Sequence, residues 1–167
     1  KRNLFNIDLL SANSNYKLIC KQIKKYEPKM FVVKDQITFL KIKNKYKKHK
    51  VNILDSFNKV NLKKKTDICI SAIPGFSGLE PTISSIKFSK KILIANKESV
   101  ICGWNLIKNL SEKKNTKLIP IDSEHFSILK LLEKNKLNEV KKIYITASGG
   151  PFLHYKKSQM VKIKPKD

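Results

Sequence analysis

Short runs of β-branched and aromatic residues alternate along the chain with segments whose apolar residues recur every three or four positions. The short runs predict strands, at residues 5–11, 30–33, 51–54, 67–73, 91–95, 117–121 and 142–147. Helical spacing is clearest at 16–26 and recurs at 100–113 and 126–140. Because strands and helices alternate, the pattern predicts an α/β fold with a mostly parallel sheet flanked by helices.

The order of apolar and polar positions also predicts where a site would lie. The runs at 67–73 and 91–95 are almost continuously apolar, which is typical of strands covered on both faces. Ligands bind parallel α/β sheets beyond the carboxyl ends of the strands. Polar or glycine-rich segments follow five of the predicted strands, at 11–15, 74–78, 96–99, 122–125 and 148–152. In one parallel sheet all five would meet at a single edge.

Composition narrows the class of protein. The 167 residues suit one domain, or one domain and part of another. The chain is 41% hydrophobic, which argues against wholesale disorder. No apolar run approaches the roughly 20 residues that a membrane-spanning helix needs, so we expect no membrane partner.

The net charge of +23 would suit a nucleic-acid-binding protein. However, Arg2 is the single arginine among 36 basic residues, and arginine is the preferred reader of guanine edges and phosphates. The lysines are spread through the whole chain together with many Ile and Asn residues, which favours a bias toward A/T-rich codons. We therefore expect no nucleic-acid partner, and keep a basic nucleic-acid-binding α/β domain without catalysis as the alternative.

The cysteines do not indicate a disulfide framework or a zinc site. Cys20, Cys69 and Cys102 are widely spaced and form no Cys-x-x-Cys pair. Cys20 and Cys69 lie among apolar neighbours, which favours small buried hydrophobic residues in a reducing compartment.

Two carboxylates follow the predicted strand at 117–121. Asp122 and Glu124 flank Ser123, and residues two apart in extended backbone project to the same side. Oxygen ligands of this kind suit Mg²⁺ or Mn²⁺. On spacing alone, the better interpretation is a helix N-cap with an acidic residue in the first turn. His125 next to such a cap is more often structural.

The other polar segments also have a functional and a structural interpretation. The segment 96–99 could hold an anion at a helix N-terminus or could simply cap the helix. Residues 148–151 offer a hydroxyl and flexible backbone near a phosphate, or an ordinary turn. The segment 11–15 could reach the ribose of a nucleotide, or could form a generic Asn- and Ser-rich turn.

Three strings are more specific together than singly: 94–99 (Ile-Ala-Asn-Lys-Glu-Ser), 119–125 (Ile-Pro-Ile-Asp-Ser-Glu-His) and 146–152 (Thr-Ala-Ser-Gly-Gly-Pro-Phe). In this order and spacing they closely resemble the 1-deoxy-D-xylulose 5-phosphate reductoisomerase family, the NADPH- and metal-dependent enzymes of non-mevalonate isoprenoid biosynthesis. The stretch 72–82 is similar to the segment that precedes the Asn-Lys-Glu-Ser motif in that family. The resemblance extends over essentially the whole chain.

The resemblance implies an assignment of domains and of site residues. A Rossmann-like NADPH-binding domain would span 1–121, and 122–167 would begin an α/β catalytic domain. Asp122 and Glu124 would hold Mn²⁺, Mg²⁺ or Co²⁺ and act in catalysis with Lys97, which reverses the preference for a simple cap. The remaining implied contacts are to NADPH by Asn13, Ser14, Asn15, Asn96 and Glu98, and to the substrate by Lys97, Ser123, Glu124 and Ser148.

The reaction implied is isomerisation and reduction of 1-deoxy-D-xylulose 5-phosphate to 2-C-methyl-D-erythritol 4-phosphate, in a homodimer of a bacterial cytoplasm or a plastid-type organelle. The family's first strand and glycine-rich turn do not precede Lys1, and its third metal carboxylate and lid lie beyond Asp167. We therefore expect a fragment that is inactive by itself. Ser14 occupies a position that is commonly Lys or Arg, so the resemblance does not decide between NADPH and NADH.

Overall fold

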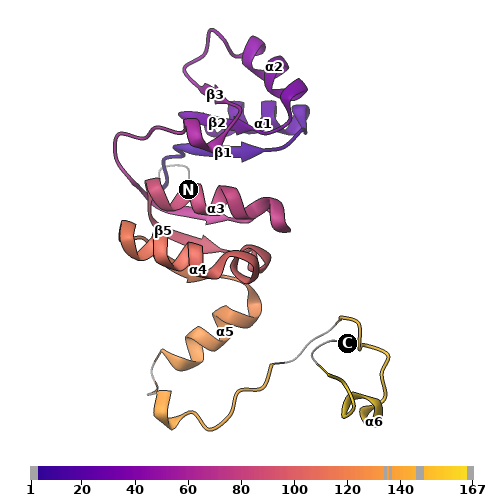
Figure 1. Ribbon diagram of the computed structural model, residues 1–167. Coiled ribbons are helices and arrows are strands. Elements are labelled where there is room, and N and C mark those ends of the chain that lie inside the picture. The colour runs from indigo at the N-terminus through magenta and orange to yellow at the C-terminus, as the bar shows by residue number, and fades with distance from the viewer. Residues whose placement is uncertain (1–3, 134, 136, 146–148, 165–167) are drawn as a thin grey trace. The chain divides into compact units, whose positions relative to one another are not determined.

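In the computed structural model, the chain folds into two compact units, Lys1–Asp122 and Ser123–Asp167. The structure describes residues 4–133, 135, 137–145 and 149–164. Figure 1 shows that the first unit contains the sheets and most of the helices. No helix among these residues has the length and apolar character to cross a membrane.

The first sheet is parallel and has the order β1-β2-β3, with bounds Leu9–Ala12, Met30–Val33 and Asn52–Leu54. Its first strand was predicted to begin at residue 5, but pairing begins at Leu9, opposite the first residue of β2. Helices α1 (Tyr16–Tyr26) and α2 (Gln36–Lys45) pack on one face, and α1 has the predicted bounds. This face forms a core of Ile19, Cys20, Ile23, Phe31, Val33, Phe39, Ile42, Tyr46 and Ile53.

The opposite face of the first sheet is also covered. Met30 and Val32 alternate with Phe31 and Val33 along β2, and all four side chains are buried. Met30 and Val32 pack with Leu54 of β3 and Ile73, and with Phe57, Val60 and Leu62 from the segment that leads into the second sheet. This sheet therefore has the two covered faces that its parallel strands require.

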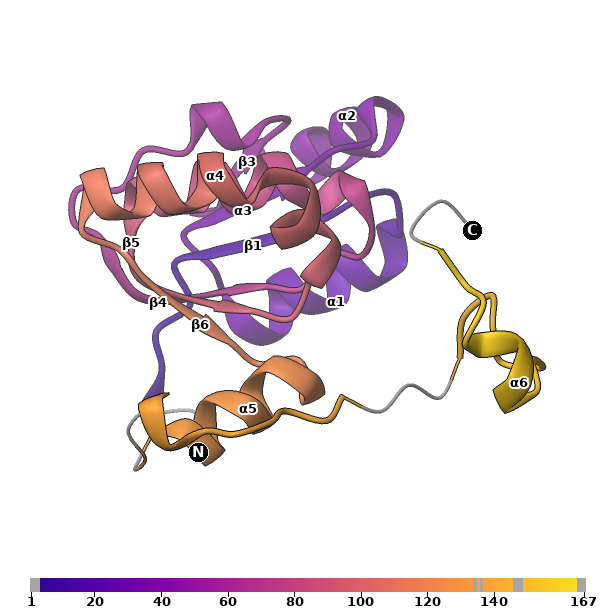
Figure 2. The same cartoon turned by 60° about the horizontal axis from the view of Figure 1, so that its bottom comes forward.

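The second sheet is parallel with the order β4-β5-β6, at Thr66–Ser71, Ser89–Ile94 and Lys117–Pro120. Helices α3 (Leu79–Phe88) and α4 (Lys97–Lys114) cover one face, where Ile86, Ile92, Ile94 and Ile107 are buried (Figure 2). The prediction that both faces of the 67–73 strand are covered was wrong for the described residues. Ile68 and Ile70 lie on the other face and are 48% and 64% exposed, because no described segment packs over them.

The strands form two sheets where a single sheet was expected, because no described strand pairs with the outer edge of β1 or of β4. The carboxyl ends of the two sheets nevertheless meet. Lys34, directly after β2, forms an ion pair with Glu80 in the first turn of α3, with 3.4 Å between Nζ and Oε2. The segments that follow β1, β2, β4 and β5 thus lie on one side of the first unit.

The second unit contains α5 (Ser123–Leu132), a 3₁₀ turn at Leu137–Glu139 and the short α6 (Lys157–Met160). The helix predicted at 126–140 is therefore shorter and begins earlier. The strand predicted at 142–147 is not formed over 142–145, and 146 and 147 lie outside the described residues. Ile143, Tyr144 and Ile145 are exposed, and no strand of the described residues pairs with this apolar run.

Candidate functional site

The segment after β1 is fixed by hydrogen bonds to both of its neighbouring helices. Asn15 caps α1, since its Oδ1 accepts the Leu18 N–H at 3.0 Å. The Ser14 carbonyl accepts the Thr38 hydroxyl of α2 at 3.2 Å. The side chains of Asn13, Ser14 and Asn15 are exposed. Asn15 is thus a helix N-cap, which the sequence did not predict, and the loop still offers polar groups to a ligand.

Asn96 lies at the end of β5 and links two segments that are distant in sequence. It is only 2% exposed. Its Oδ1 accepts the Ser99 N–H at 2.6 Å, which caps α4. Its Nδ2 donates to the carbonyl oxygens of Ile73 and of Gly75, the latter at 3.0 Å. The side chain of Asn96 therefore holds the loop after β4 against the first turn of α4.

Two positions in the loop at 73–78 favour glycine, for different reasons. Gly75 has φ 69° and ψ −169°, a region that other residues avoid. A Cβ on Gly78 would lie 2.3 Å from Asn96 Nδ2 and 2.3 Å from the Ile73 oxygen. Thr82 fixes the end of the loop, because its hydroxyl donates to the Gly78 carbonyl at 2.7 Å.

Lys97 and Glu98 form the exposed first turn of α4, where the helix dipole leaves partial positive charge. Gly103 departs from helical geometry, with φ −130° and ψ 22°, and separates this turn from the rest of the helix. Lys97 thus adds a cation to the same edge as the 73–78 loop, where the site was expected.

Three of the expected metal and substrate residues are consecutive in the sequence where the first unit ends and the second begins. Asp122 ends the first unit and is half-buried. Ser123 and Glu124 begin α5 in the second unit, and the Ser123 hydroxyl donates to Glu124 Oε2 at 2.8 Å. Ser148 lies outside the described residues. The structure describes each of these residues only within its own unit.

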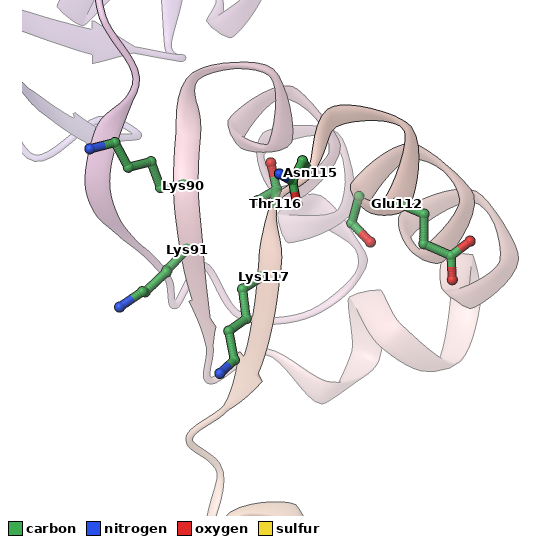
Figure 3. Close-up of a pocket in the computed structure, with 7 residues that line it drawn as sticks. Lys90, Lys91, Glu112, Asn115, Thr116 and Lys117 are labelled. Carbon is green, nitrogen blue, oxygen red and sulfur yellow. The ribbon is translucent and has the colours of Figure 1, made fainter.

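One cavity in the first unit does not lie at the carboxyl edge. It has a volume of about 500 Å³ and lies at the amino ends of β5 and β6 (Figure 3). Lys90, Lys91 and Lys117 line it together with Ser111, Glu112, Asn115 and Thr116. Since parallel sheets bind ligands at the opposite edge, we do not assign this cavity as the site.

Sequence reasoning missed two residues that shape the site, Ser71 and Thr82. Both are buried, and their hydroxyl oxygens lie 2.6 Å apart. Thr82 belongs to the 72–82 stretch that was noted as similar to a family segment, but Ser71 gave no signal, since a serine at a strand end is common. The contact exists because the fold brings the end of β4 against α3.

Two family models match the chain in succession. The model described as 1-deoxy-D-xylulose 5-phosphate reductoisomerase matches residues 1–103, and the model of the C-terminal domain of the same enzyme matches 118–167. Relatives with that name include one from Pelagibacter ubique, 50% identical over 96% of this chain and 43% of the relative. Another, from Clostridium novyi, is 34% identical over 98% of this chain and 44% of its own length.

Solved structures agree with the family models. The reductoisomerase of Zymomonas mobilis in complex with NADPH superimposes with a TM-score of 0.79 at 28% identity, over 99% of this chain and 44% of that one. A reductoisomerase in complex with NADPH, fosmidomycin and magnesium gives 0.77 at 25% identity, over 95% and 42%. The chain thus spans less than half the length of the relatives it matches.

Proposed function

Since the chain belongs to the 1-deoxy-D-xylulose 5-phosphate reductoisomerase family, we propose that the full protein converts 1-deoxy-D-xylulose 5-phosphate and NADPH into 2-C-methyl-D-erythritol 4-phosphate and NADP⁺, with a divalent metal. The observation that carries the proposal is the succession of the two domain models along one chain. The chain supplies the residues of both domains that resemble the family's site. The expected homodimer and the bacterial or plastid-type location stay predictions.

NADPH is proposed to lie along the carboxyl edge of the first unit. Asn13, Ser14 and Asn15 offer exposed polar groups after β1, and Glu98 is exposed in the first turn of α4. The resemblance also implies a contribution by Asn96, whose buried side chain is bonded to the backbone of this edge. The edge fits a pyrophosphate cofactor, because a Cβ at Gly75 would meet no atom within 4 Å, which leaves room for close approach, and because the start of α4 favours an anion. The relative from Zymomonas mobilis is an NADPH complex.

Asp122 and Glu124 are proposed to hold the divalent metal. Their oxygen-only chemistry suits Mg²⁺, Mn²⁺ or Co²⁺, and one structural relative contains magnesium. The described residues contain no group of three or more His, Cys, Asp or Glu side chains that could hold a metal ion. The two carboxylates are therefore the right type of ligand for such a metal. The proposal requires at least one further ligand from elsewhere in the full protein.

The phosphorylated sugar is proposed to bind next to these carboxylates. Lys97 supplies a positive charge, and Ser123 and Ser148 supply hydroxyl groups. When bound, a metal of this type acts as a Lewis acid and a template for the substrate's oxygens. NADPH supplies the hydride. This chain's own residues orient the substrate and complement its charge.

The proposal is tested with the purified full-length protein by following NADPH absorbance after addition of 1-deoxy-D-xylulose 5-phosphate. We expect consumption only when both the sugar phosphate and Mg²⁺ or Mn²⁺ are present, with one product molecule per NADPH oxidised. Consumption that continues after chelation of the metal, or none under any of these conditions, would refute the proposed function.

A further inference from the structure

We propose that Asn96 and Thr82 are positioning residues that clamp the 73–78 loop from two sides and thereby set the affinity of the carboxyl edge for NADPH. The structural part of this proposal depends only on contacts within the first unit. Its consequence for NADPH rests on the proposed function. The residues act through the loop backbone and need no contact with the cofactor.

Asn96 has no donor left for a ligand. A primary amide has two N–H groups, and those of Asn96 are directed at the Ile73 and Gly75 carbonyl oxygens. Its oxygen accepts the Ser99 N–H, and the residue is 2% exposed. The side chain thus satisfies backbone groups of two segments that lie 21 or more residues apart in sequence. Its effect on a ligand must be transmitted by those segments.

Thr82 holds the other end of the loop. Its hydroxyl carries one hydrogen, which is donated to the Gly78 carbonyl. In the 2.6 Å contact between the Ser71 and Thr82 hydroxyl oxygens, Ser71 must therefore be the donor. A chain of two hydrogen bonds consequently connects the end of β4, through α3, to the last residue of the loop. Both hydroxyl-bearing residues are buried, so water does not compete for these bonds.

The loop has little freedom between these two attachments. A Cβ added to Gly78 would collide with the Asn96 amide and with the Ile73 carbonyl oxygen. A loop that already has its bound conformation loses less entropy when a ligand binds. Release of either attachment should therefore weaken the binding of NADPH without removing any atom that touches it.

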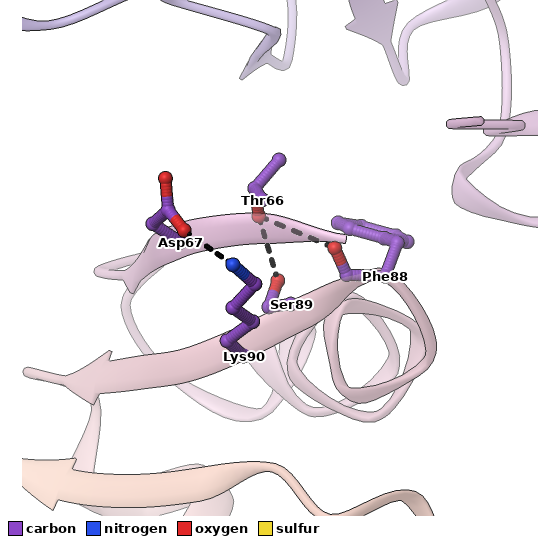
Figure 4. Close-up of polar contacts among 5 residues, drawn as sticks. All are labelled: Thr66, Asp67, Phe88, Ser89 and Lys90. Atoms are coloured by element: carbon purple, nitrogen blue, oxygen red, sulfur yellow. Dashed lines mark hydrogen bonds and ion pairs between the residues drawn. The ribbon is translucent and has the colours of Figure 1, made fainter. Parts of the chain in front are cut away.

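Three single variants of the full-length protein separate this effect from general destabilisation. Asn96→Asp keeps the oxygen that caps α4 but places a carboxylate oxygen against two carbonyl oxygens. Thr82→Val removes the bond to Gly78 at constant shape. Thr66→Val is the matched control, because Thr66 makes hydrogen bonds to Phe88 and Ser89 at the amino end of the same sheet (Figure 4).

NADPH affinity is measured by fluorescence titration, and stability by urea unfolding. We expect Asn96→Asp and Thr82→Val each to raise the Kd for NADPH about tenfold, the equivalent of one net hydrogen bond. Thr66→Val should leave the Kd within about twofold, although it loses a comparable bond. In the Asn96→Asp, Thr82→Val double variant the two effects should be less than additive, since both release the same loop.

A direct contact between Asn96 and NADPH makes a different prediction, in which Thr82→Val leaves the Kd unchanged. That result would overturn the proposal, as would an equal increase in Kd for Thr66→Val. If Asn96→Asp does not fold, the proposal is still tested by comparing the Kd for NADPH of Thr82→Val with that of Thr66→Val.

Hydrogen exchange of the 75–78 amides, measured without cofactor, is independent of the proposed function. We expect faster exchange in Asn96→Asp and Thr82→Val and no change in Thr66→Val. Unchanged exchange in the first two variants would refute the clamp itself. A wild-type protein that shows protected amides but no NADPH binding would instead refute the proposed function.

Discussion

At Gly78, two chain segments approach so closely that the residue type is dictated by packing. The site of a Cβ at this position lies 2.3 Å from one backbone oxygen and 2.3 Å from the Asn96 amide nitrogen. The φ of Gly78 is −79°, which any residue can adopt. Close approach, and no special backbone conformation, thus requires glycine here.

We expect Gly78→Ala to destabilise the first unit by about 1 to 3 kcal/mol, because the added methyl group must displace backbone. Gly149→Ala is the control, since a Cβ there meets no atom within 4 Å. Urea unfolding of the two variants measures the difference. Equal unfolding free energies for the two variants would contradict the close packing at Gly78.

The three cysteines should differ in reactivity. Cys102 is exposed and Cys20 is buried. Burial raises the pKa of the Cys69 thiol, and contacts with the Ser85 and Ser89 side chains offset this only in part. Because the thiolate is the reactive form, iodoacetamide at mildly alkaline pH should modify Cys102 at least about tenfold faster than Cys69.

Alkylation of Cys69 should become faster as the pH is raised toward its elevated pKa, since a larger fraction of the thiol is then ionised. Peptide mapping by mass spectrometry after timed quenching gives the rate at each cysteine. Equal rates for Cys69 and Cys102 in the folded protein would show that Cys69 is not shielded. Equal rates only after unfolding in urea would agree with the structure.

At the level of single residues, the sequence predicts caps better than tertiary contacts. A cap joins residues three apart, so Asn96 could be interpreted as a cap from local pattern alone, and it is one. The segment that contains Asn15 was interpreted only as a ligand-binding loop or a turn, although Asn15 also caps its helix. The bonds from Asn96 to the 73–78 loop join residues 21 and 23 apart. Nothing in the local pattern specifies such a contact, because it depends on how β4 and β5 pair.

At the level of elements, β4 and β5 are joined at their amino ends by an ion pair as well as by backbone hydrogen bonds. Lys90 Nζ lies 2.8 Å from Asp67 Oδ1 (Figure 4). The pKa of Asp67 is lowered below its usual value, mainly by the hydrogen bond from Lys90 and to a smaller extent by the charge of its ammonium group. Because the Asp67 side chain is 85% exposed, solvent screens this pair and its effect on stability should be small.

We expect Lys90→Met to raise the pKa of Asp67 toward the ordinary aspartate value. Lys113→Met, which removes a lysine from the last turn of α4, should leave it unchanged. Since the folded-state pKa lies below the unfolded one, any stability from this pair is present above the unfolded pKa and is lost as the pH falls through the folded value. Titration of the carboxyl carbon by NMR measures both shifts, and an equal pKa in wild type and Lys90→Met would contradict the pairing.

The sequence predicted helices and strands correctly where the described residues also supply the segments that pack against them. Helix 16–26 and strand 30–33 have the predicted bounds, and the strand is buried on both faces, with the helix packed on one of them. The segment 142–145 has the same β-rich composition and forms no strand. A strand is stabilised by partners, and composition does not reveal whether a partner is present. The expected cover over Ile68 and Ile70 was wrong for the same reason.

At the scale of the whole molecule, neither the net charge nor the chain length indicates a function by itself. The net charge of +23 is compatible with a phosphorylated substrate and a pyrophosphate cofactor as well as with nucleic acid. The cavity lined by lysines lies at the edge of the sheet opposite the proposed site. The chain spans less than half of its relatives, so the proposed metal ligands in this chain, Asp122 and Glu124, are only part of a site.

The most direct test compares Asp122→Asn with Asp67→Asn in the full-length protein, because both remove one carboxylate but only the first is a proposed metal ligand. NADPH oxidation by the sugar phosphate is measured against Mg²⁺ or Mn²⁺ concentration. We predict that Asp122→Asn lowers turnover by roughly 100-fold or more, as expected for loss of metal-based stabilisation, while its Kd for NADPH and the turnover of Asp67→Asn stay unchanged. Wild-type turnover in Asp122→Asn, with an unaltered metal dependence, would contradict the account.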